Sequence, residues 1–289
     1  MDNSIINEAR KKYHDSLIEN KVLTISGDGV SSNADSHNTP SVIIAKLLAN
    51  KLNVRTASKL KGQTSGNLFE VITTQFVLDT FPKMQSLRPG KWNVLNLGNQ
   101  NSLKTSDFEQ YAHLAYLNML VSENKQLSAM LGNDYMVAPD IVIYRDLYND
   151  EEINADALFV DDNISLMASL RKKNGGKPIL HASISAKWTM RSDRAQNSRT
   201  EALNLIRNRK GHLPHIVVVT GEPLPSRLAS LALGTGDIDC VYHFALYELQ
   251  DAVKEYAKSG RDDIQETLDT LIEGKRLKDI SDLPLDLSV

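Results

Sequence analysis

Three strand-like segments, at residues 136–144, 179–190 and 215–220, constrain the fold of this chain more than any other feature. Each is short and bounded by residues that favour turns, and the last reads His-Ile-Val-Val-Val-Thr, which is typical of a β-strand. Near-continuous apolar strands belong in sheets whose two faces are both covered by helices. The three segments therefore predict a sheet inside a helical shell.

Helical spacing of apolar residues marks the stretches between and around these strands. It occurs at residues 41–52, 67–84, 106–131 and 245–258. A further helix is expected to begin near Asp193, which can cap it, and to end at Gly211. The order of strands and helices predicts an α/β fold. Because no repeat or linker-like composition shift is present, we expect a single domain over residues 1–289.

Three further features of the sequence concern a loop, disulfide formation and the cellular location of the protein. Residues 23–40 are rich in Ser, Gly, Asn and Asp, which predicts an extended loop. The single cysteine, Cys240, lies in an apolar run, so it cannot form an internal disulfide and is expected in the core. No segment approaches the roughly 18 apolar residues of a membrane span, and the N-terminus lacks secretory features, so we expect a cytoplasmic protein.

The charge distribution indicates that any contact with nucleic acid is local. The formal net charge is -3, which argues against a protein that coats nucleic acid by overall electrostatics. Basic residues outnumber acidic ones between Lys187 and Lys210. That cluster is equally compatible with a solvated helix face.

Two short motifs contain residue types that are suited to catalysis. Pro139-Asp140 starts one predicted strand, and Ser185-Ala186-Lys187 lies on the next. Strand side chains alternate between faces, so Ser185 and Lys187 point the same way while Trp188 points toward the core. A carboxylate and an ammonium group are what a metal-dependent nuclease needs. Taken alone, Asp140 also fits a turn carboxylate and Lys187 a solvent-facing lysine.

The pattern is similar to the split Pro-Asp...(Asp/Glu)-x-Lys signature of a large nuclease superfamily, with one departure. Ser185 stands where the second carboxylate is expected. The helix after Lys187 offers Glu201 near its second turn, and this side chain could fold back over the strand end. Glutamate is also common in helices for its propensity alone.

Longer stretches resemble the NgoMIV-like type II restriction endonucleases. They are residues 62–67 followed by Phe69 and Glu70, and residues 181–197, 207–220 and 274–286. The similarity covers almost the whole chain and is weakest before residue 30 and around residues 255–272. It implies a restriction-endonuclease-like core, in which a central mixed β-sheet is flanked by α-helices.

The resemblance also implies roles for individual residues. In this group the second carboxylate moves from the strand to the following helix, so Glu201 compensates for Ser185. Asp140 and Glu201 would bind Mg2+, two ions per active site, Lys187 would serve the reaction, Ser185 would line the site and Glu70 would complete it. The products would carry a 5′-phosphate.

A set of exposed polar residues is expected to read DNA. Arginine can bond both acceptors of guanine, and aspartate can accept from cytosine, so Arg191, Asp193 and Arg194 suit G·C pairs. The resemblance implies a central CCGG within the palindrome GCCGGC and 5′ overhangs. It assigns the outer pairs to Arg227 and the loop with Asp35 and Ser36, and the minor groove to Gln63; Arg227 could instead solvate a helix start.

A palindromic target implies two-fold symmetry in the protein that reads it. The resemblance implies a homotetramer, a dimer of dimers that acts on two copies of double-stranded DNA. Two alternatives remain open from the residues. One is a DNA-binding protein without catalysis, in which Asp140 is structural. The other is a nuclease of the same superfamily with a role in repair, which would cut by DNA structure rather than sequence.

Overall fold

The computed structural model describes residues 4–98, 105–124, 126, 139–234, 236–258 and 260–289. Within them, a six-stranded sheet has its strands side by side in sequence order. The strands are β1 (Trp92–Asn96), β2 (Ile141–Arg145), β3 (Ile179–Lys187), β4 (His215–Thr220), β5 (Cys240–His243) and β6 (Leu277–Asp279). Pairing is antiparallel from β1 to β3 and parallel from β3 to β6. The expected mixed sheet is confirmed.

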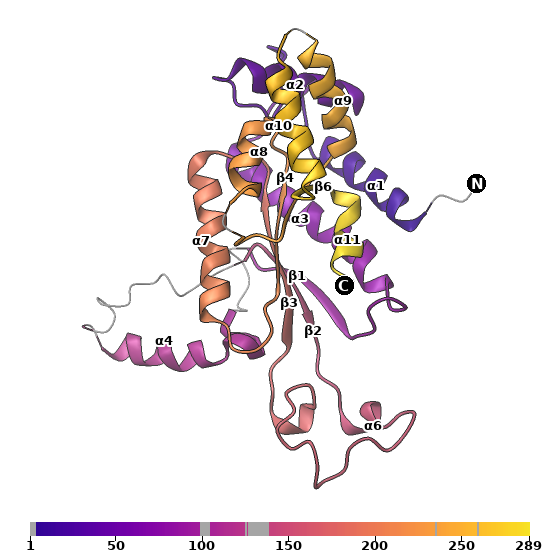
Figure 1. Ribbon diagram of the computed structural model, residues 1–289, viewed down its shortest axis with the longest axis vertical. Helices are drawn as coiled ribbons and strands as arrows, with labels where there is room; N and C mark the ends of the chain where they lie inside the picture. Colours follow the sequence, from indigo (N-terminus) through magenta and orange to yellow (C-terminus); the bar gives the residue numbers. More distant parts are fainter. Residues whose placement is uncertain (1–3, 99–104, 125, 127–138, 235, 259) are drawn as a thin grey trace.

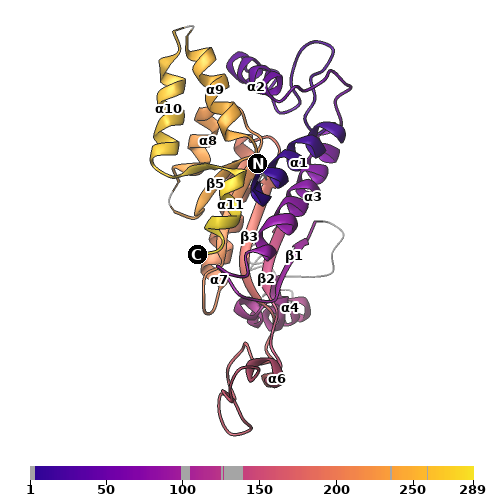
Figure 2. The same cartoon turned by 90° about the vertical axis from the view of Figure 1, so that its right-hand side faces the viewer.

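Helices cover both faces of this sheet, as its apolar strands require. Figure 2 shows α1 (Ile5–Glu19) and α3 (Gly62–Thr80) on one side, and α7 (Ser192–Asn208), α8 (Pro225–Ala232) and α10 (Asp262–Glu273) on the other. The central strand β4 is buried from Ile216 to Thr220. Two further helices, α2 (Thr39–Lys51) and α9 (Leu246–Ala257), pack against each other at one end of the molecule (Figure 1). The α/β fold class predicted from the sequence is therefore correct.

Most expected elements form, with shifted ends. Helix α3 begins at Gly62 and is followed by a 3-10 turn at Phe81–Lys83. Strand β3 ends at Lys187, and β2 begins at Ile141; residues 136–138 of its expected range lie outside the described residues. The long helix expected at 106–131 is α4 (His113–Glu123), preceded by 3-10 turns at Thr105–Asp107 and Glu109–Tyr111. Residues 127–131 again lie outside the described part.

The expected cap of α7 is wrong. The helix begins at Ser192, its N-cap position is the extended residue Arg191, and no side chain caps it. Asp193 is therefore a residue of the first helical turn, and its exposed side chain is not used as a cap. The apolar side of the helix, with Ala195, Ala202 and Leu205 buried, fixes its rotation against the sheet.

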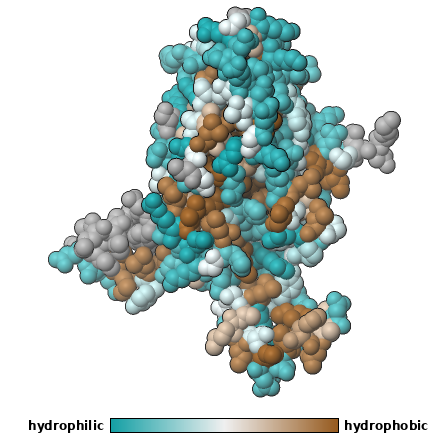
Figure 3. All heavy atoms as spheres, viewed as in Figure 1, coloured by the Kyte–Doolittle hydropathy of each residue, from teal (hydrophilic) through white to brown (hydrophobic). Residues whose placement is uncertain are grey.

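A lobe formed by residues 146–178 projects from the sheet between β2 and β3 (Figure 1). Its centre is Arg171, whose side chain is 1% exposed and donates to Asp150 and to the carbonyl oxygens of Asp161 and Ile164. Five large apolar side chains point outward, namely those of Leu158, Phe159, Ile164, Leu166 and Met167. Figure 3 shows apolar residues gathered on this projection.

Other expectations concerned single residues and the loop at 23–40. Cys240 is buried, as expected. The loop contains only isolated bridges, from Ile25 to Ser31 and to Thr56, before α2 begins at Thr39. Among the described residues, no helix has both the length and the apolar content needed to span a membrane.

Candidate active site

The antiparallel pairing of β2 with β3 brings Asp140 to Lys187. Ile141 lies opposite Ile184, so Asp140, one residue before β2, faces the last residues of β3. The Lys187 Nζ donates to Asp140 Oδ2 at 2.7 Å, and the Ala186 N–H donates to the same oxygen at 2.8 Å. The Ser185 hydroxyl lies 3.4 Å from it. The strand alternation predicted from the sequence places these groups in one site.

Helix α7 contributes Glu201 from its third turn, one turn later than expected. Ser185 Oγ lies 3.3 Å from Ser198 Oγ, which holds this part of α7 against β3. Burial raises the pKa of Glu201 to about 7, although the Lys187 charge lowers it; Asp140 raises it further. Glu201 is therefore an acid that interacts electrostatically with Lys187 and Asp140.

Helix α3 contributes Glu70, because it packs along β1 and β3. Burial raises the pKa of Glu70 to about 7, and the charges of Asp140 and Glu201 add to this effect. Burial alone would lower the pKa of Lys187, but the carboxylates around it raise the pKa overall. The lysine thus stays protonated among more negative charges than it can neutralise.

The carboxylates of the site suit a hard divalent cation, but they do not form a complete coordination sphere by themselves. Asp140 and Glu201 offer carboxylate oxygens, which Mg2+ prefers. Within the residues that the structure describes, no three His, Cys, Asp or Glu side chains are grouped closely enough to hold a metal ion unaided. Mg2+ usually keeps several waters and shares its coordination with substrate phosphates. The excess negative charge beside Lys187 is what such a cation would neutralise.

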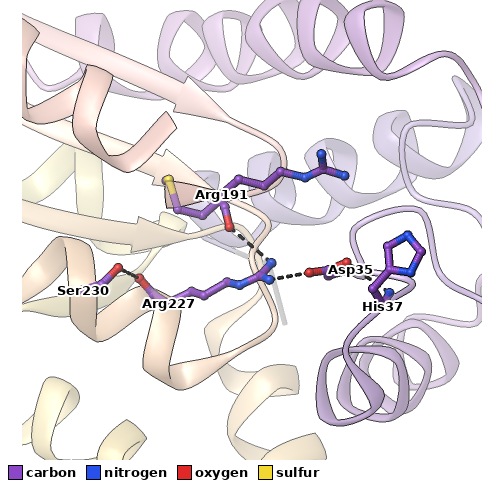
Figure 4. Close-up of a pocket in the computed structure, with 6 residues that line it drawn as sticks. Asp35, His37, Arg191, Arg227 and Ser230 are labelled. Carbon is purple, nitrogen blue, oxygen red and sulfur yellow. Dashed lines mark hydrogen bonds and ion pairs between the residues drawn. The ribbon is translucent and has the colours of Figure 1, made fainter. Parts of the chain in front are cut away.

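Next to this site, three separate segments form a polar pocket. It is lined by Asp35 and His37 of the N-terminal loop, by Met190 and Arg191 at the start of α7, and by Arg227 and Ser230 of α8. Figure 4 shows Arg227 extending toward Asp35, with which it forms an ion pair. Arg227 Nη1 also lies 3.4 Å from the Met190 carbonyl oxygen.

A second pocket continues from the first along the start of α3. It is lined by Lys59, Gly62, Ser65 and Arg194, and it shares Asp35, Arg191 and Arg227 with the first pocket. Arg194 Nη1 donates to the Thr189 carbonyl oxygen at 3.1 Å and to its hydroxyl at 2.5 Å. Arg191, Arg194, Arg227 and Asp35 thus meet around one hollow.

Two other expected contact residues lie at its edge. Ser36 and Gln63 are exposed neighbours of the lining residues Asp35 and Gly62, and neither lines the pockets itself. Trp188 is buried against Phe69 and Phe244, with ring centroids 5.0 and 5.2 Å away, so its expected place in the core is confirmed.

Several residues at the site were not assigned a role from the sequence. These are His37, Lys59, Thr189, Ser198 and Ser230, together with the buried Glu222 beside Arg227. His37 alone carried a local signal, since it lies two residues from Asp35 in the same loop. The others are recognisable only after β3, β4 and the N-terminal loop have come together.

A mixed sheet that presents an acid and a lysine from adjoining strands, with a helical glutamate above them, defines a nuclease of the restriction-endonuclease-like class. The family model described as NgoMIV restriction enzyme matches residues 13–289. The type II restriction enzyme NgoMIV of Neisseria gonorrhoeae is 53% identical over 288 residues, which are 99% of this chain and 100% of the relative. The chain belongs to the NgoMIV restriction enzyme family. Its members are type II restriction enzymes, which are site-specific deoxyribonucleases.

Proposed function

We propose that this protein is a cytoplasmic, Mg2+-dependent restriction endonuclease that cuts double-stranded DNA at GCCGGC and leaves 5′ overhangs with 5′-phosphates. Residues 1–289 would act as one domain. The observation that carries the proposal is the Lys187–Asp140 contact of 2.7 Å, with Glu201 and Glu70 around it, beside the pockets that contain Arg191, Arg194 and Arg227. The groups that we assign to cleavage and to base reading lie at the same end of the sheet.

The catalytic roles follow from the charges. Asp140 and Glu201 would hold Mg2+, two ions per active site, which stabilise the attacking and leaving oxygens when bound. Lys187 would bring its ammonium group to the scissile phosphate and the attacking water, since Asp140 fixes its direction. Ser185 would line the site between Asp140 and α7, and Glu70 would add a further acidic group from α3.

The reading roles follow from donor and acceptor types. Arg191, Asp193 and Arg194, around the start of α7, would read the central CCGG in the major groove. Arg227 with Asp35 would read the outer G·C pair, assisted by Ser36. Gln63 would reach the minor groove from the start of α3. The separation of Asp35 and Arg227 by 192 positions in the chain, against their ion pair in space, supports a joint role.

We further propose a homotetramer, a dimer of dimers that engages two DNA copies. A palindrome requires at least a two-fold dimer, and the lobe offers an additional apolar surface for a second copy of the chain. Light scattering should give the tetramer mass. Phe159→Ser combined with Met167→Ser should reduce it, whereas Leu285→Ser, at an exposed position outside the lobe, should not.

The decisive test is to digest plasmid and genomic DNA with Mg2+ and to sequence the ends. We expect all ends to map to one palindrome, and no cleavage in EDTA. Specific binding without fragments would instead support a DNA-binding protein without catalysis. Ends that follow DNA structure rather than sequence would support a repair nuclease.

A further inference from the structure

The turn that follows β4 contains a charged side chain with no assigned role. Glu222 is 1% exposed, yet carboxylates are rarely buried without a compensating partner. Burial raises the pKa of Glu222 to about 7, so its ionised form is costly in this position. Glu222 lies beside Arg227, which lines the polar pocket, so its contacts should explain why it is buried there.

The contacts of Glu222 connect two segments that carry base-reading residues. Its Oε2 accepts from the Met190 N–H at 2.9 Å, directly before Arg191 and α7. Its Oε1 accepts from the Leu224 N–H at 3.1 Å, and Leu224 is the N-cap residue of α8, which carries Arg227. One carboxylate therefore fixes the backbone entering both helices.

Glu222 also faces Arg227 itself. The Glu222 Oε2 lies 3.7 Å from Arg227 Nη1, while Arg227 Nη2 pairs with Asp35. The guanidinium is thus held from two sides, by a buried carboxylate behind it and by a part-exposed one in front. Since an arginine side chain has many rotamers, this arrangement fixes the direction in which its remaining donors point.

The same turn is tied to the catalytic strand and to the N-terminal loop. The Thr220 hydroxyl donates to the Lys187 carbonyl oxygen at 2.8 Å and accepts from the Glu222 N–H at 3.2 Å. The Asn33 side chain donates to the Gly221 carbonyl oxygen at 2.8 Å. A Cβ on Gly221 would lie 2.6 Å from Trp188, so glycine is needed for this close approach.

We propose that Glu222 is a positioning residue for DNA specificity. It holds Arg227 and the Met190–Arg191 backbone at fixed relative positions, so that the outer base pair and the inner ones can be read at the same time. This inference rests on the proposed role of Arg227 in reading the outer pair. Glu222 acts through Arg227 and the Met190–Arg191 backbone, and we assign it no contact with DNA or with the reacting atoms.

The test compares Glu222→Gln with the unmodified protein on three duplexes: GCCGGC, the same site with altered outer pairs, and the same site with altered inner pairs. The substitution keeps the size and one acceptor but removes the charge. We expect discrimination against altered outer pairs to fall about tenfold, the scale of one good base contact. KM for the unaltered site should rise and kcat should change little. Discrimination at the inner pairs should fall less than at the outer pairs, because the remaining amide oxygen can still accept from the Met190 N–H.

Two controls separate positioning from stability. Glu248→Gln makes the same change beside another arginine, Arg10, and should lower the melting temperature without altering discrimination. If Glu222→Gln does not fold, Glu222→Asp keeps the charge but withdraws it from Arg227, and the same loss of outer-pair discrimination is expected. Unchanged discrimination in a folded Glu222 variant would overturn the inference.

Arg227→Ala in the same assay tests the underlying proposal. If Arg227→Ala leaves outer-pair discrimination intact, the reading role of Arg227 fails. If Arg227→Ala reduces it but Glu222→Gln does not, that role stands and the positioning inference alone fails. In the Arg227→Ala background, Glu222→Gln should have no further effect on outer-pair discrimination, because the two residues act as one unit in reading that pair.

Discussion

Two part-buried charge clusters in this protein each combine one basic side chain with carboxylates, and they are balanced in opposite ways. One joins Arg10 of α1 to Glu248 and Asp279. Its guanidinium makes four hydrogen bonds of 2.6 to 2.9 Å to the two carboxylates. Burial alone would raise the pKa values of Glu248 and Asp279, but their bonds to Arg10 lower them overall. Each charge in this cluster has a partner.

The active-site cluster is the opposite case. Lys187 donates to Asp140 alone among the three carboxylates around it, and the pKa values of Glu70 and Glu201 are raised to about 7. The excess of negative charge is destabilising without a cation. The comparison teaches that a structural cluster neutralises its charges within the protein, whereas a functional cluster retains unneutralised charge that a ligand can neutralise.

Removing a member of the active-site cluster should produce the largest effect on activity. Asp140→Ala and Lys187→Ala should each lower cleavage by on the order of a thousandfold, since each removes a group that serves the reaction. Specific binding, measured by gel shift with Ca2+ in place of Mg2+, should stay largely intact. Full cleavage by either variant would contradict the catalytic assignment. The active-site cluster would then not differ in function from the Arg10 cluster.

Breaking the structural cluster should affect folding instead. Asp279 is fully buried, and Asp279→Asn leaves the part-buried Arg10 with one carboxylate, so the free energy of unfolding should fall by about 3 kcal/mol. Urea denaturation measures this loss. Cleavage per folded molecule should remain that of the unmodified protein. A variant that keeps its stability but loses cleavage would show that the two clusters are not distinct in role.

Arg194 allows a smaller test of whether an arginine at the site has donors available for a ligand. The guanidinium of Arg10 donates to carboxylates, whereas that of Arg194 donates to Thr189 through Nη1 and lines the pocket. Arg194→Ala should weaken specific binding by roughly 1 to 3 kcal/mol, the value of a bidentate contact to guanine. Equilibrium titration of cognate and altered duplexes gives the difference. Retained affinity and selectivity would exclude a reading role.

The smallest effect expected is on stability as a function of pH. The pKa of Glu70 is about 7 in the folded protein against its ordinary value of 4.5, so the folded state binds more protons between these values. The free energy of unfolding therefore falls as the pH rises through this window. In EDTA, Glu70→Gln should be more stable than the unmodified protein above pH 7 by about 1 kcal/mol, after allowance for solvent screening.

Urea denaturation at the two ends of this window measures the Glu70 effect. The stability difference between the two proteins should shrink toward the acid end, where Glu70 is protonated in both the folded and the unfolded state. The Arg10 cluster predicts the reverse dependence, because the lowered pKa values of Glu248 and Asp279 add stability that is lost as the pH falls. A Glu70→Gln difference that does not vary with pH would contradict the assignment of Glu70 to an unbalanced cluster.

The predicted site residues differ in how well the sequence located them. The structure brings Ser185 and Lys187 to Asp140, as expected from strand alternation, which has a fixed period of two, and from the Pro-Asp step, which marks a strand start. Glu201 was assigned through the family resemblance and lies one helical turn later than expected. The capping role of Asp193 was wrong, since Arg191 occupies the N-cap and leaves the aspartate free on the first turn.

The sequence by itself determined the α/β class, the apolar strands and the two polar groups that face one way from β3, since these depend on periodicities within a few residues. Only the tertiary structure decided that Asp35 meets Arg227 across 192 positions and that Glu222 lies beneath both helix starts. The physical reason is that parallel pairing of β3 with β4 brings their carboxyl ends to one edge, where the turns that follow must bond to each other. No local pattern encodes which distant turn will be there.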